Sequence, residues 1–308
     1  ALDAGFPADK IVFAGVGKAD WEINLGLDND IFCFNVESAV ELEIINELAA
    51  AKNKVASIAL RINPEVDAHT HAKITTGMKE NKFGINLSQL GGVLDKLKEM
   101  KNVKLIGIHS HIGSQITDMS SFRNLVIRFN EIQEELEAHG VTVENLNFGG
   151  GLGIDYYHPN HLSIPAFDNY FAAIHKLLQV RPGQQVHFEP GRSIVAQCGT
   201  LISKVLYVKE GETKKFAILD AGFTELIRPA MYDAYHRIEN ISSDEAVETY
   251  DVVGPICESS DVFGKDVELN KAHRGDLIAL RSAGAYGEVM ASQYNCRHLP
   301  KAYYSDTI

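Results

Sequence analysis

Short apolar stretches alternate with amphipathic stretches through the first two thirds of the chain. Six of the apolar runs are rich in β-branched and aromatic residues and are apolar on both faces, as expected for strands of a covered parallel sheet. We predict strands at Ile11–Gly15, Ile31–Val36, Ser57–Asn63, Leu105–His109, Leu146–Phe148 and Val186–Glu189.

Three stretches between these strands carry helical periodicity. Ser38–Glu41 has the spacing of a capping box and predicts a helix that continues to about Lys52. Ser121–His139 places its apolar residues on one face, and Ala166–Leu178 is also amphipathic. Repeated strand–helix units indicate either a doubly wound sheet or a (β/α) barrel.

Polar or glycine residues follow nearly every predicted strand. Asn63, His109, His111, Gly149–Gly151 and Glu189 all occupy such positions. A barrel gathers functional groups at the ends of many strands, whereas a doubly wound sheet concentrates them at one switch point. The pattern therefore favours a TIM-like (β/α) barrel.

The pattern changes after about Arg192. Strand-like runs are now separated by Gly, Asn, Asp and Lys turns, without a long amphipathic helix. We predict a barrel over residues 1–193 and a mostly antiparallel β domain over 194–308. The strands expected in this domain are Leu201–Val208, Phe216–Asp220, Tyr250–Val253 and Leu277–Leu280.

Composition narrows the class of protein. The 308 residues suffice for two domains, and the net charge of −12 argues against a nucleic-acid partner, which needs a basic face. No run approaches the roughly 20 apolar residues of a membrane span. The four cysteines form no C-x-x-C pair and the N-terminus has no signal region, which predicts a reducing, cytoplasmic compartment.

Two glycine- or proline-rich segments are candidate ligand sites. In 147–153 (NFGGGLG), consecutive glycines can present backbone N–H groups to a phosphate, but a tight barrel turn explains them equally well. In 187–192 (HFEPGR), Glu189 and Arg192 flank Pro190-Gly191 at a strand end and are placed to bind a ligand, although a surface ion pair is the simpler explanation.

Histidine and cysteine residues add weaker candidates. If the strand continues, His109 and His111 lie on the same face of it, and they are candidates for metal ligands, a stacking platform or core residues. No carboxylate or cysteine set accompanies them, so we expect no metal site, and 67–71 (DAHTH) is expected to be a polar loop. Cys257, beside Glu258, is either a reactive thiol or an inert apolar residue.

Taken in order, these segments resemble one family over essentially the whole chain. They are 109–115 (HSHIGSQ), 149–154 (GGGLGI), 189–192 (EPGR), 225–236 (ELIRPAMYDAYH), 257–261 (CESSD) and 285–287 (AYG). The series is similar to the diaminopimelate decarboxylases, pyridoxal-phosphate enzymes of the alanine-racemase-type barrel fold. That resemblance implies conversion of meso-2,6-diaminopimelate to L-lysine and CO2, the last step of lysine biosynthesis.

The resemblance also implies roles for individual residues. The glycines 149–151 and Tyr286, with Ser114, would hold the phosphate of the pyridoxal 5'-phosphate cofactor. His111 would stack on the cofactor ring, and Glu189 would contact its nitrogen. The Pro190-Gly191-Arg192 segment would complete the cofactor site.

The substrate side of the site follows from the same resemblance. Arg192, Arg228 and Tyr232, with Tyr286, would bind the distal carboxylate of the substrate, and Glu258 would meet its distal ammonium. Cys257 would be the acid that reprotonates the substrate carbon. In the family, Cys257 and Glu258 reach the partner subunit's site, so a homodimer with shared active sites is expected.

One family feature is missing from the sequence. The cofactor-binding lysine of the family lies on the first barrel strand in an aromatic-Ala-x-Lys-Ala context, which does not occur in the sequence. Lys18 follows a segment that matches a later strand, so we reject it as a substitute. Matched by motif, the first strands of the barrel are absent, and we expect an N-terminally incomplete chain that is inactive as it stands.

Three alternatives remain open at this stage. An ornithine- or arginine-type decarboxylase shares the barrel motifs. A non-catalytic pyridoxal-phosphate protein on the same barrel would account for the missing lysine but not for the substrate-end residues. A metal-dependent barrel hydrolase would need more carboxylates and histidines at the strand ends than the sequence supplies.

Overall fold

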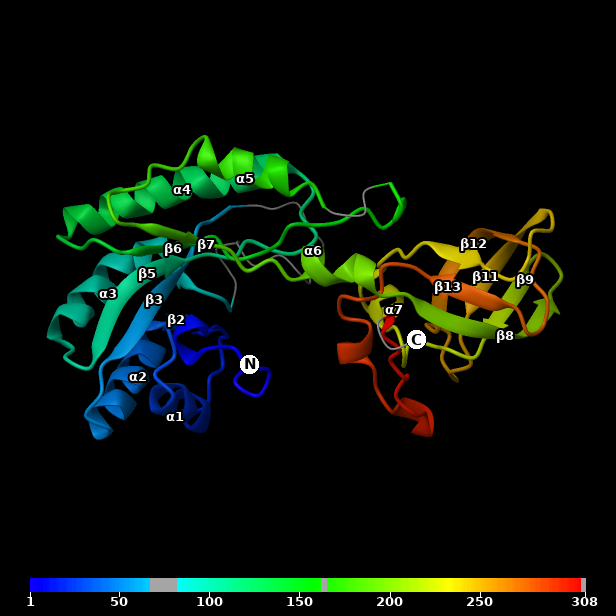
Figure 1. The fold of residues 1–308 in the computed structure, drawn as a ribbon, viewed down its shortest axis with the longest axis horizontal. Helices are drawn as coiled ribbons and strands as arrows, with labels where there is room; N and C mark the ends of the chain where they lie inside the picture. The colour runs from blue at the N-terminus through cyan, green and yellow to red at the C-terminus, as the bar shows by residue number, and fades with distance from the viewer. Residues whose placement is uncertain (67–81, 162–164, 306–308) are drawn as a thin grey trace. The chain divides into compact units, whose positions relative to one another are not determined.

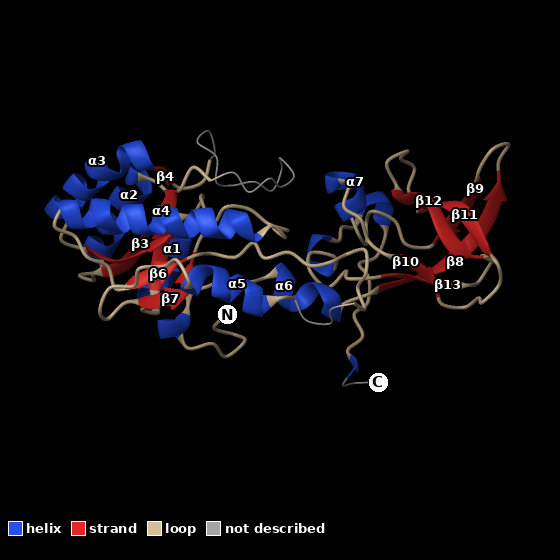
Figure 2. Cartoon of the chain, turned by 90° about the horizontal axis from the view of Figure 1, so that it is seen from above, coloured by secondary structure: helices blue, strands red, loops and turns tan. Residues whose placement is uncertain are grey.

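The computed structural model describes residues 1–66, 82–161 and 165–305. The chain forms two compact units, which we call unit 1 (Ala1–Leu152 with Phe167–Pro190) and unit 2 (Gly153–Ala166 with Gly191–Ile308). Figure 2 shows helices throughout unit 1 and most of the strands of unit 2 gathered in one region. The loop predicted at 67–71 lies outside the described residues.

The two units differ in one respect from the predicted division. Residues 153–166 were expected in the barrel, but they cluster with unit 2. The reason is local packing, since Ile154 and Tyr156 form a small buried group with Ala196 and Ala285. The domain boundary that we predicted from the sequence, after residue 193, stays a prediction.

Unit 1 is built on a parallel sheet with the strand order β1-β2-β3-β5-β6-β7, and β4 pairs with β3 (Figure 1). Neighbouring strands follow one another in sequence without the reversal that defines a doubly wound sheet, so the predicted barrel class is confirmed. The strands are β1 (Val12–Phe13), β2 (Cys33–Val36), β3 (Ala56–Asn63), β4 (Ile85–Asn86), β5 (Val103–His109), β6 (Asn145–Asn147) and β7 (Gln185–His187).

Helices connect these strands and carry the outer part of the core. Within the described part of unit 1, the structure has the three predicted helices together with α1 and α3, which were not predicted. They are α1 (Asp20–Asp28), α2 (Ala39–Ala51), α3 (Leu87–Glu99), α4 (Met119–Ala138) and α5 (Phe167–His175), with a 3₁₀ turn, η1, at Ala8–Lys10. Figure 1 shows α4 and α5 side by side, where Phe122 meets Tyr170 edge-on at 4.7 Å between ring centroids.

The predicted capping box of α2 forms only in part. Ser38 Oγ accepts the Glu41 N–H at 3.2 Å, as expected. The Glu41 carboxylate does not return to the Ser38 N–H; it accepts the Glu37 N–H at 2.6 Å and binds Lys18 Nζ at 2.5 Å. The tertiary contact of Glu41 with Lys18 therefore replaces the expected capping-box bond from Glu41 to the Ser38 N–H.

Unit 2 contains a six-stranded sheet in the order β10-β13-β8-β9-β11-β12. Its pairs are antiparallel except β9 with β11, so the predicted mostly antiparallel β domain is confirmed. Its elements are α6 (Arg192–Val195), η2 (Ala196–Cys198), β8 (Leu201–Glu210), β9 (Lys215–Leu219), α7 (Arg228–Tyr232), β10 (Ile238–Asn240), β11 (Val247–Val253), β12 (Val262–Asn270), β13 (Leu277–Leu280), η3 (Glu288–Met290) and η4 (Tyr294–Cys296).

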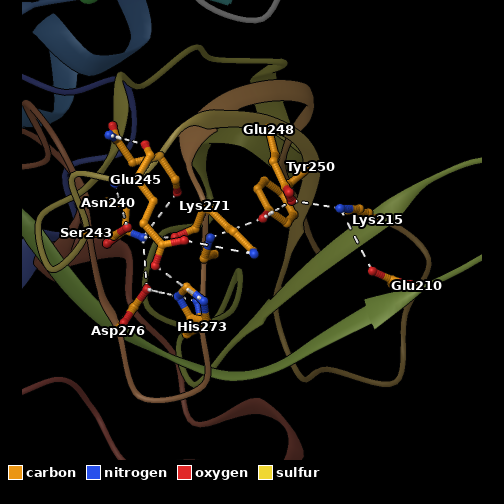
Figure 3. Close-up of polar contacts among 12 residues, drawn as sticks. Glu210, Lys215, Asn240, Ser243, Glu245, Glu248, Tyr250, Lys271, His273 and Asp276 are labelled. Atoms are coloured by element: carbon orange, nitrogen blue, oxygen red, sulfur yellow. Dashed lines mark hydrogen bonds and ion pairs between the residues drawn. The ribbon is translucent and has the colours of Figure 1, made fainter.

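A buried tyrosine ties the hairpins of this sheet together. Tyr250 is 1% exposed, and its hydroxyl donates to Glu248 Oε2 at 2.8 Å and accepts the Ala272 N–H at 3.1 Å (Figure 3). Lys215 Nζ holds the same Glu248 oxygen at 2.7 Å. The hydroxyl thus links β11 to the turn that follows β12.

Replacing Tyr250 with phenylalanine should lower the free energy of unfolding by about 1–3 kcal/mol, because the Ala272 N–H loses its acceptor inside the protein. Urea denaturation followed by circular dichroism measures the change. The matched control is Tyr207→Phe at a side chain that is 56% exposed. Equal stability of the two variants would contradict the assignment.

Candidate active site

A carboxylate surrounded by neutral donors lies at the carboxyl ends of the parallel strands of unit 1. Glu189 follows β7, and Glu189 Oε1 accepts the Asn147 Nδ2–H at 2.9 Å and the Asn35 Nδ2–H at 3.4 Å. His109 Nε2 lies 3.3 Å from Glu189 Oε2. Burial acts to raise the pKa of Glu189, but the hydrogen bonds of His109 and Asn147, together with electrostatic attraction to His109, outweigh it and lower the pKa to about 2. Glu189 is therefore an anion at neutral pH.

His111 stands beside this carboxylate as a neutral ring. Burial, with the charge of Arg61, lowers the pKa of His111 to about 4. Its Nδ1 accepts the Gly150 N–H at 3.2 Å, which places the ring proton on Nε2. The tautomer and the ring orientation are thus set by the backbone of the glycine turn.

The glycine turn 149–151 is packed too tightly for any other residue. A Cβ on Gly150 would lie 2.2 Å from the Glu189 carbonyl oxygen, and one on Gly149 would lie 2.5 Å from the Ser110 carbonyl oxygen. The Gly149 N–H donates to Asn147 Oδ1 at 2.9 Å, and the Gly150 N–H is taken by His111. Only the Gly151 N–H has no acceptor within the described residues, so two of the three expected phosphate donors are already in use.

Unit 2 holds two buried arginines on a shared aromatic ring. Arg192 is 6% exposed and Arg228 is 5% exposed. Arg192 Nη1 donates to the Tyr156 hydroxyl at 2.8 Å, and the Arg228 guanidinium lies over the Tyr156 ring at 5.0 Å. Tyr286 completes the group, since its ring lies 4.9 Å from the Arg192 guanidinium. The predicted residues Arg192, Arg228 and Tyr286 therefore belong to one cluster.

A histidine fixes the orientation of Arg228. Arg228 Nη1 donates to His236 Nε2 at 2.8 Å, and His236 Nδ1 donates to the Arg281 carbonyl oxygen at 2.8 Å. Burial, together with the charges of Arg228 and Arg192, lowers the pKa of His236 to about 4, so the ring is neutral and can accept. Within the described residues, no carboxylate pairs with Arg228.

The other predicted residues lie at helix ends or on loops. Gly191 precedes α6, and the half-buried Tyr232 ends α7. Ser114 and Pro190 are half-buried in unit 1. Cys257 and Glu258 are exposed on the loop between β11 and β12 of unit 2, where Glu258 Oε1 accepts the Tyr294 hydroxyl at 2.7 Å.

The sequence reasoning missed several residues of these groups. Asn35 and Asn147 around Glu189, and Tyr156 and His236 around the arginines, were not predicted. Asn35 lies in a predicted strand and Asn147 just before the glycine turn, so polar residues in apolar strands were the available signal. Nothing in the sequence paired Tyr156 with His236, because 80 residues separate positions 156 and 236 (236 − 156 = 80).

The rejection of Lys18 as a cofactor lysine is supported by its contacts. Its side chain is fully buried, and Nζ donates to the Gly15 and Asn35 carbonyl oxygens at 2.7 Å each and to Glu41 Oε1 at 2.5 Å. These three bonds use every proton of the ammonium group. Lys18 therefore braces β1, β2 and α2.

Comparison with known proteins shows which family the chain belongs to. Residues 1–196 match the family model described as "Pyridoxal-dependent decarboxylase, pyridoxal binding domain". The chain is thus a pyridoxal-dependent decarboxylase of the barrel class. Within this class, the chain belongs to the diaminopimelate decarboxylase family.

Individual relatives support that assignment. The diaminopimelate decarboxylase of Bacteroides thetaiotaomicron is 68% identical over 308 residues, covering 100% of this chain and 80% of the relative. The crystal structure of the Helicobacter pylori enzyme complexed with L-lysine is 41% identical with a TM-score of 0.89, over 96% of this chain and 73% of that one. The Methanocaldococcus jannaschii enzyme is 42% identical over 96% of this chain and 68% of the relative.

These comparisons correct one expectation. The chain was expected to be inactive, but the relatives at this level of identity are decarboxylases, so that expectation is not borne out. Within the described residues, no group of three or more His, Cys, Asp and Glu residues could hold a metal ion, and no helix is long and apolar enough to cross a membrane.

The described residues fit pyridoxal phosphate. A neutral His111 offers a ring face, and an anionic Glu189 offers a partner for a protonated ring nitrogen. The Gly151 N–H is available to a phosphate oxygen. Asn35 Oδ1 is buried in the same group without a hydrogen-bond partner in the protein, a polar atom that a ligand can satisfy.

The two buried histidines should make the protein sensitive to acid. An unfolded histidine has a pKa of about 6.5, whereas His111 and His236 titrate at about 4 when folded. Between these values the unfolded chain binds more protons, so stability present above pH 6.5 is lost as the pH falls. The free energy of unfolding should decrease by up to about 1.4 kcal/mol per pH unit for each histidine.

Urea denaturation at a series of pH values from 7 to 4.5 measures this slope. His236→Gln keeps an acceptor for Arg228 and a donor for the Arg281 carbonyl, but it cannot take up the proton. The slope should therefore be shallower in this variant. Parallel pH curves for the wild type and His236→Gln would rule out His236 as a source of the acid sensitivity.

Proposed function

We propose that the protein decarboxylates meso-2,6-diaminopimelate to L-lysine and CO2 with pyridoxal 5'-phosphate. The observation that carries this proposal is Arg228, a buried guanidinium held by a neutral histidine and a tyrosine ring. A buried cation without an anionic partner is costly. A substrate with a carboxylate at its far end relieves that cost, and diaminopimelate has one.

Residues of unit 1 act on the cofactor. When bound, pyridoxal phosphate supplies the electron sink for the charge left on the α-carbon as CO2 departs. Glu189 favours a protonated ring nitrogen, because its own pKa of about 2 keeps it anionic. His111 supports the ring plane in a fixed tautomer. Ser114, Gly151 and Tyr286 bind phosphate oxygens, while Gly149 and Gly150 shape the turn and Pro190-Gly191-Arg192 completes the cofactor site.

Residues of unit 2 recognise the far end of the substrate. Arg192 and Arg228 present planar donor forks to the distal carboxylate, which suit bidentate recognition. Tyr286, whose ring lies 4.9 Å from the Arg192 guanidinium, and Tyr232 also bind that carboxylate, and Glu258 pairs with the distal ammonium. A substrate that lacks the distal carboxylate leaves Arg228 unpaired and is rejected.

Cys257 donates the proton that completes the reaction. Its S–H bond breaks as a C–H bond forms at the α-carbon, and the thiolate then takes a proton from water. Overall, the substrate loses one CO2 and gains one proton. An exposed thiol on a loop can reach a substrate that a buried thiol such as Cys33 cannot.

Steady-state kinetics of the full-length protein with its cofactor test the proposal. CO2 release from diaminopimelate, ornithine, arginine and lysine should differ, with the kcat/KM for diaminopimelate highest by at least about 10⁴-fold. The alternative of an ornithine- or arginine-type decarboxylase predicts equal or greater efficiency on those substrates. Binding of the cofactor without turnover of any of them would favour a non-catalytic protein.

We also propose a cytoplasmic homodimer with shared sites, in which Cys257 and Glu258 serve the partner subunit. The exposed loop that carries both residues is consistent with this arrangement. Mixing Cys257→Ala subunits with Glu189→Gln subunits provides the test. Mixed dimers with shared sites regain one intact site and part of the activity, whereas absence of recovery after subunit exchange would exclude sharing. The division into a barrel over 1–193 and a β domain over 194–308 remains part of the proposal.

A further inference from the structure

A single buried carboxylate ties together the loop that carries Cys257 and Glu258. Asp261 is 3% exposed, and its Oδ2 accepts the Ile256 N–H at 2.7 Å while its Oδ1 accepts the Phe223 N–H at 2.7 Å. The Asp261 N–H donates to the Glu258 carbonyl oxygen at 3.1 Å, and the Gly254 N–H donates to the Asp261 carbonyl oxygen at 3.0 Å. Three of these bonds therefore close the loop on both sides of Cys257, and the fourth joins the loop to Phe223.

Two glycines make room for this carboxylate. A Cβ on Gly254 would lie 2.2 Å from Asp261 Oδ2, and one on Gly222 would lie 2.9 Å from the same oxygen. The approach of the carboxylate to the backbone thus requires residues without side chains at both positions. The close packing of the Asp261 carboxylate against Gly254 and Gly222 is therefore specific to this residue.

The surface that receives the loop is itself held in place. Glu225 Oε2 accepts the Gly222 N–H at 2.7 Å, and Arg297 Nε binds Glu225 Oε1 at 3.0 Å. Burial, with the nearby charge of Glu225, raises the pKa of Asp261, while its N–H donors and the charge of Arg297 act in the opposite direction. The turn at 222–225 therefore gives Asp261 a fixed support.

The side chain of Glu258 is anchored to the same turn. Tyr294 donates its hydroxyl to Glu258 Oε1 at 2.7 Å, and the Tyr294 ring stacks on Phe223 with centroids 5.8 Å apart. Phe223 is thus linked to Asp261 through its backbone and to Glu258 through the Tyr294 ring. Both links therefore reach the part of the loop that follows Cys257.

We propose that Asp261 is a positioning residue that sets the placement of Cys257 and Glu258. The proposal rests on the functions proposed above for these two residues. Asp261 contacts neither substrate nor cofactor; it acts by fixing the backbone from which the thiol and the carboxylate project. Loss of one of its two carboxylate bonds should leave the domain folded and the loop loose.

The test is Asp261→Asn in a background with Cys198→Ser and Cys296→Ser, so that Cys257 is the one exposed thiol among the described cysteines. Asparagine keeps one acceptor and places an amide N–H against the other backbone N–H. The alkylation rate of Cys257 by iodoacetamide should change by at least about threefold, and kcat on diaminopimelate should fall on the order of 10- to 100-fold. The KM should rise as well, because Glu258 is proposed to bind the distal ammonium, while the cofactor affinity should change little.

The matched control is Asp251→Asn. Asp251 is also buried in unit 2, accepts the Asp266 N–H at 2.9 Å and pairs with Lys214, but it lies on β11 away from this loop. It should lower thermal stability by a similar amount without changing the alkylation rate or kcat. If Asp261→Asn does not fold, Gly254→Ala displaces the same carboxylate and is measured in the same way.

An unchanged Cys257 alkylation rate together with an unchanged kcat in a folded variant would overturn the proposal. So would equal effects of Asp261→Asn and Asp251→Asn on both readouts. The alkylation rate does not depend on turnover, so it decides the role of Asp261 even if diaminopimelate is not the substrate. Failure of the proposed function and failure of this inference are therefore distinguishable.

Discussion

Replacing Arg228 with leucine should lower kcat/KM for diaminopimelate on the order of 100-fold or more, mainly through KM. The substitution removes the buried guanidinium that Tyr156 and His236 hold in place. The distal carboxylate of the substrate then enters a buried space without its charged partner, which costs several kcal/mol. Cofactor affinity, measured by absorbance titration, should be unaffected.

The matched control is Arg237→Leu. Arg237 lies nine positions along the chain (237 − 228 = 9), its side chain is 49% exposed, and its nearest carboxylate oxygen is 3.7 Å away on Glu239. It should leave KM unchanged. A KM for diaminopimelate that is the same in Arg228→Leu as in the wild type would show that the distal carboxylate binds elsewhere.

The same cluster predicts a graded series at His236. His236→Leu removes the acceptor that orients Arg228, so KM should rise, but by less than in Arg228→Leu. His236→Gln keeps an acceptor and should restore most of the affinity. Recovery by glutamine separates a role in orienting the guanidinium from simple packing, because leucine and glutamine have similar volumes.

Replacing Cys257 with alanine should lower kcat on the order of 10²- to 10³-fold, the usual contribution of a positioned proton donor. The substrate is still bound by the arginine cluster, so KM should change little, and the cofactor affinity should be retained. Single-turnover measurements should show that CO2 release is less affected than lysine formation, because the C–C bond breaks before the proton is delivered.

Cys198→Ala and Cys296→Ala are the controls, since both thiols are exposed in the same unit. Neither should change kcat by more than about twofold, within the range expected of surface substitutions. Equal loss of CO2 and lysine formation in Cys257→Ala would contradict the role of the thiol as the proton donor. It would point to a role before bond cleavage.

The sequence predicted more of the fold than of the site. Strand positions in the parallel sheet follow directly from short apolar runs, because a strand covered on both faces consists mostly of apolar residues. The helix α1 was missed since its apolar face is narrow, and Trp21 in it is 67% exposed. The strands β10 and β12, which form the two edges of the sheet in unit 2, were also missed.

The motifs predicted which residues matter, but not what holds them. The glycine turn was expected to present three N–H groups to a phosphate, and the structure shows two of them bound to Asn147 and His111. His111 was a candidate from its neighbours in sequence, but its neutral state depends on burial and on Arg61, which lies on β3. Such effects depend on contacts between distant segments.

By itself, the sequence determined the barrel class, the β domain and the family, because these depend on local periodicity and on residues grouped in short motifs. Only the tertiary structure showed that Asn35, His109 and Asn147 gather around Glu189, that Tyr156 and His236 hold the two buried arginines, and that Asp261 closes the Cys257 loop. The physical reason is that hydrogen bonds, burial and charge act through space. Which residues surround a site therefore depends on how distant strands and turns pack together. The residue type at a single position in the sequence does not show this.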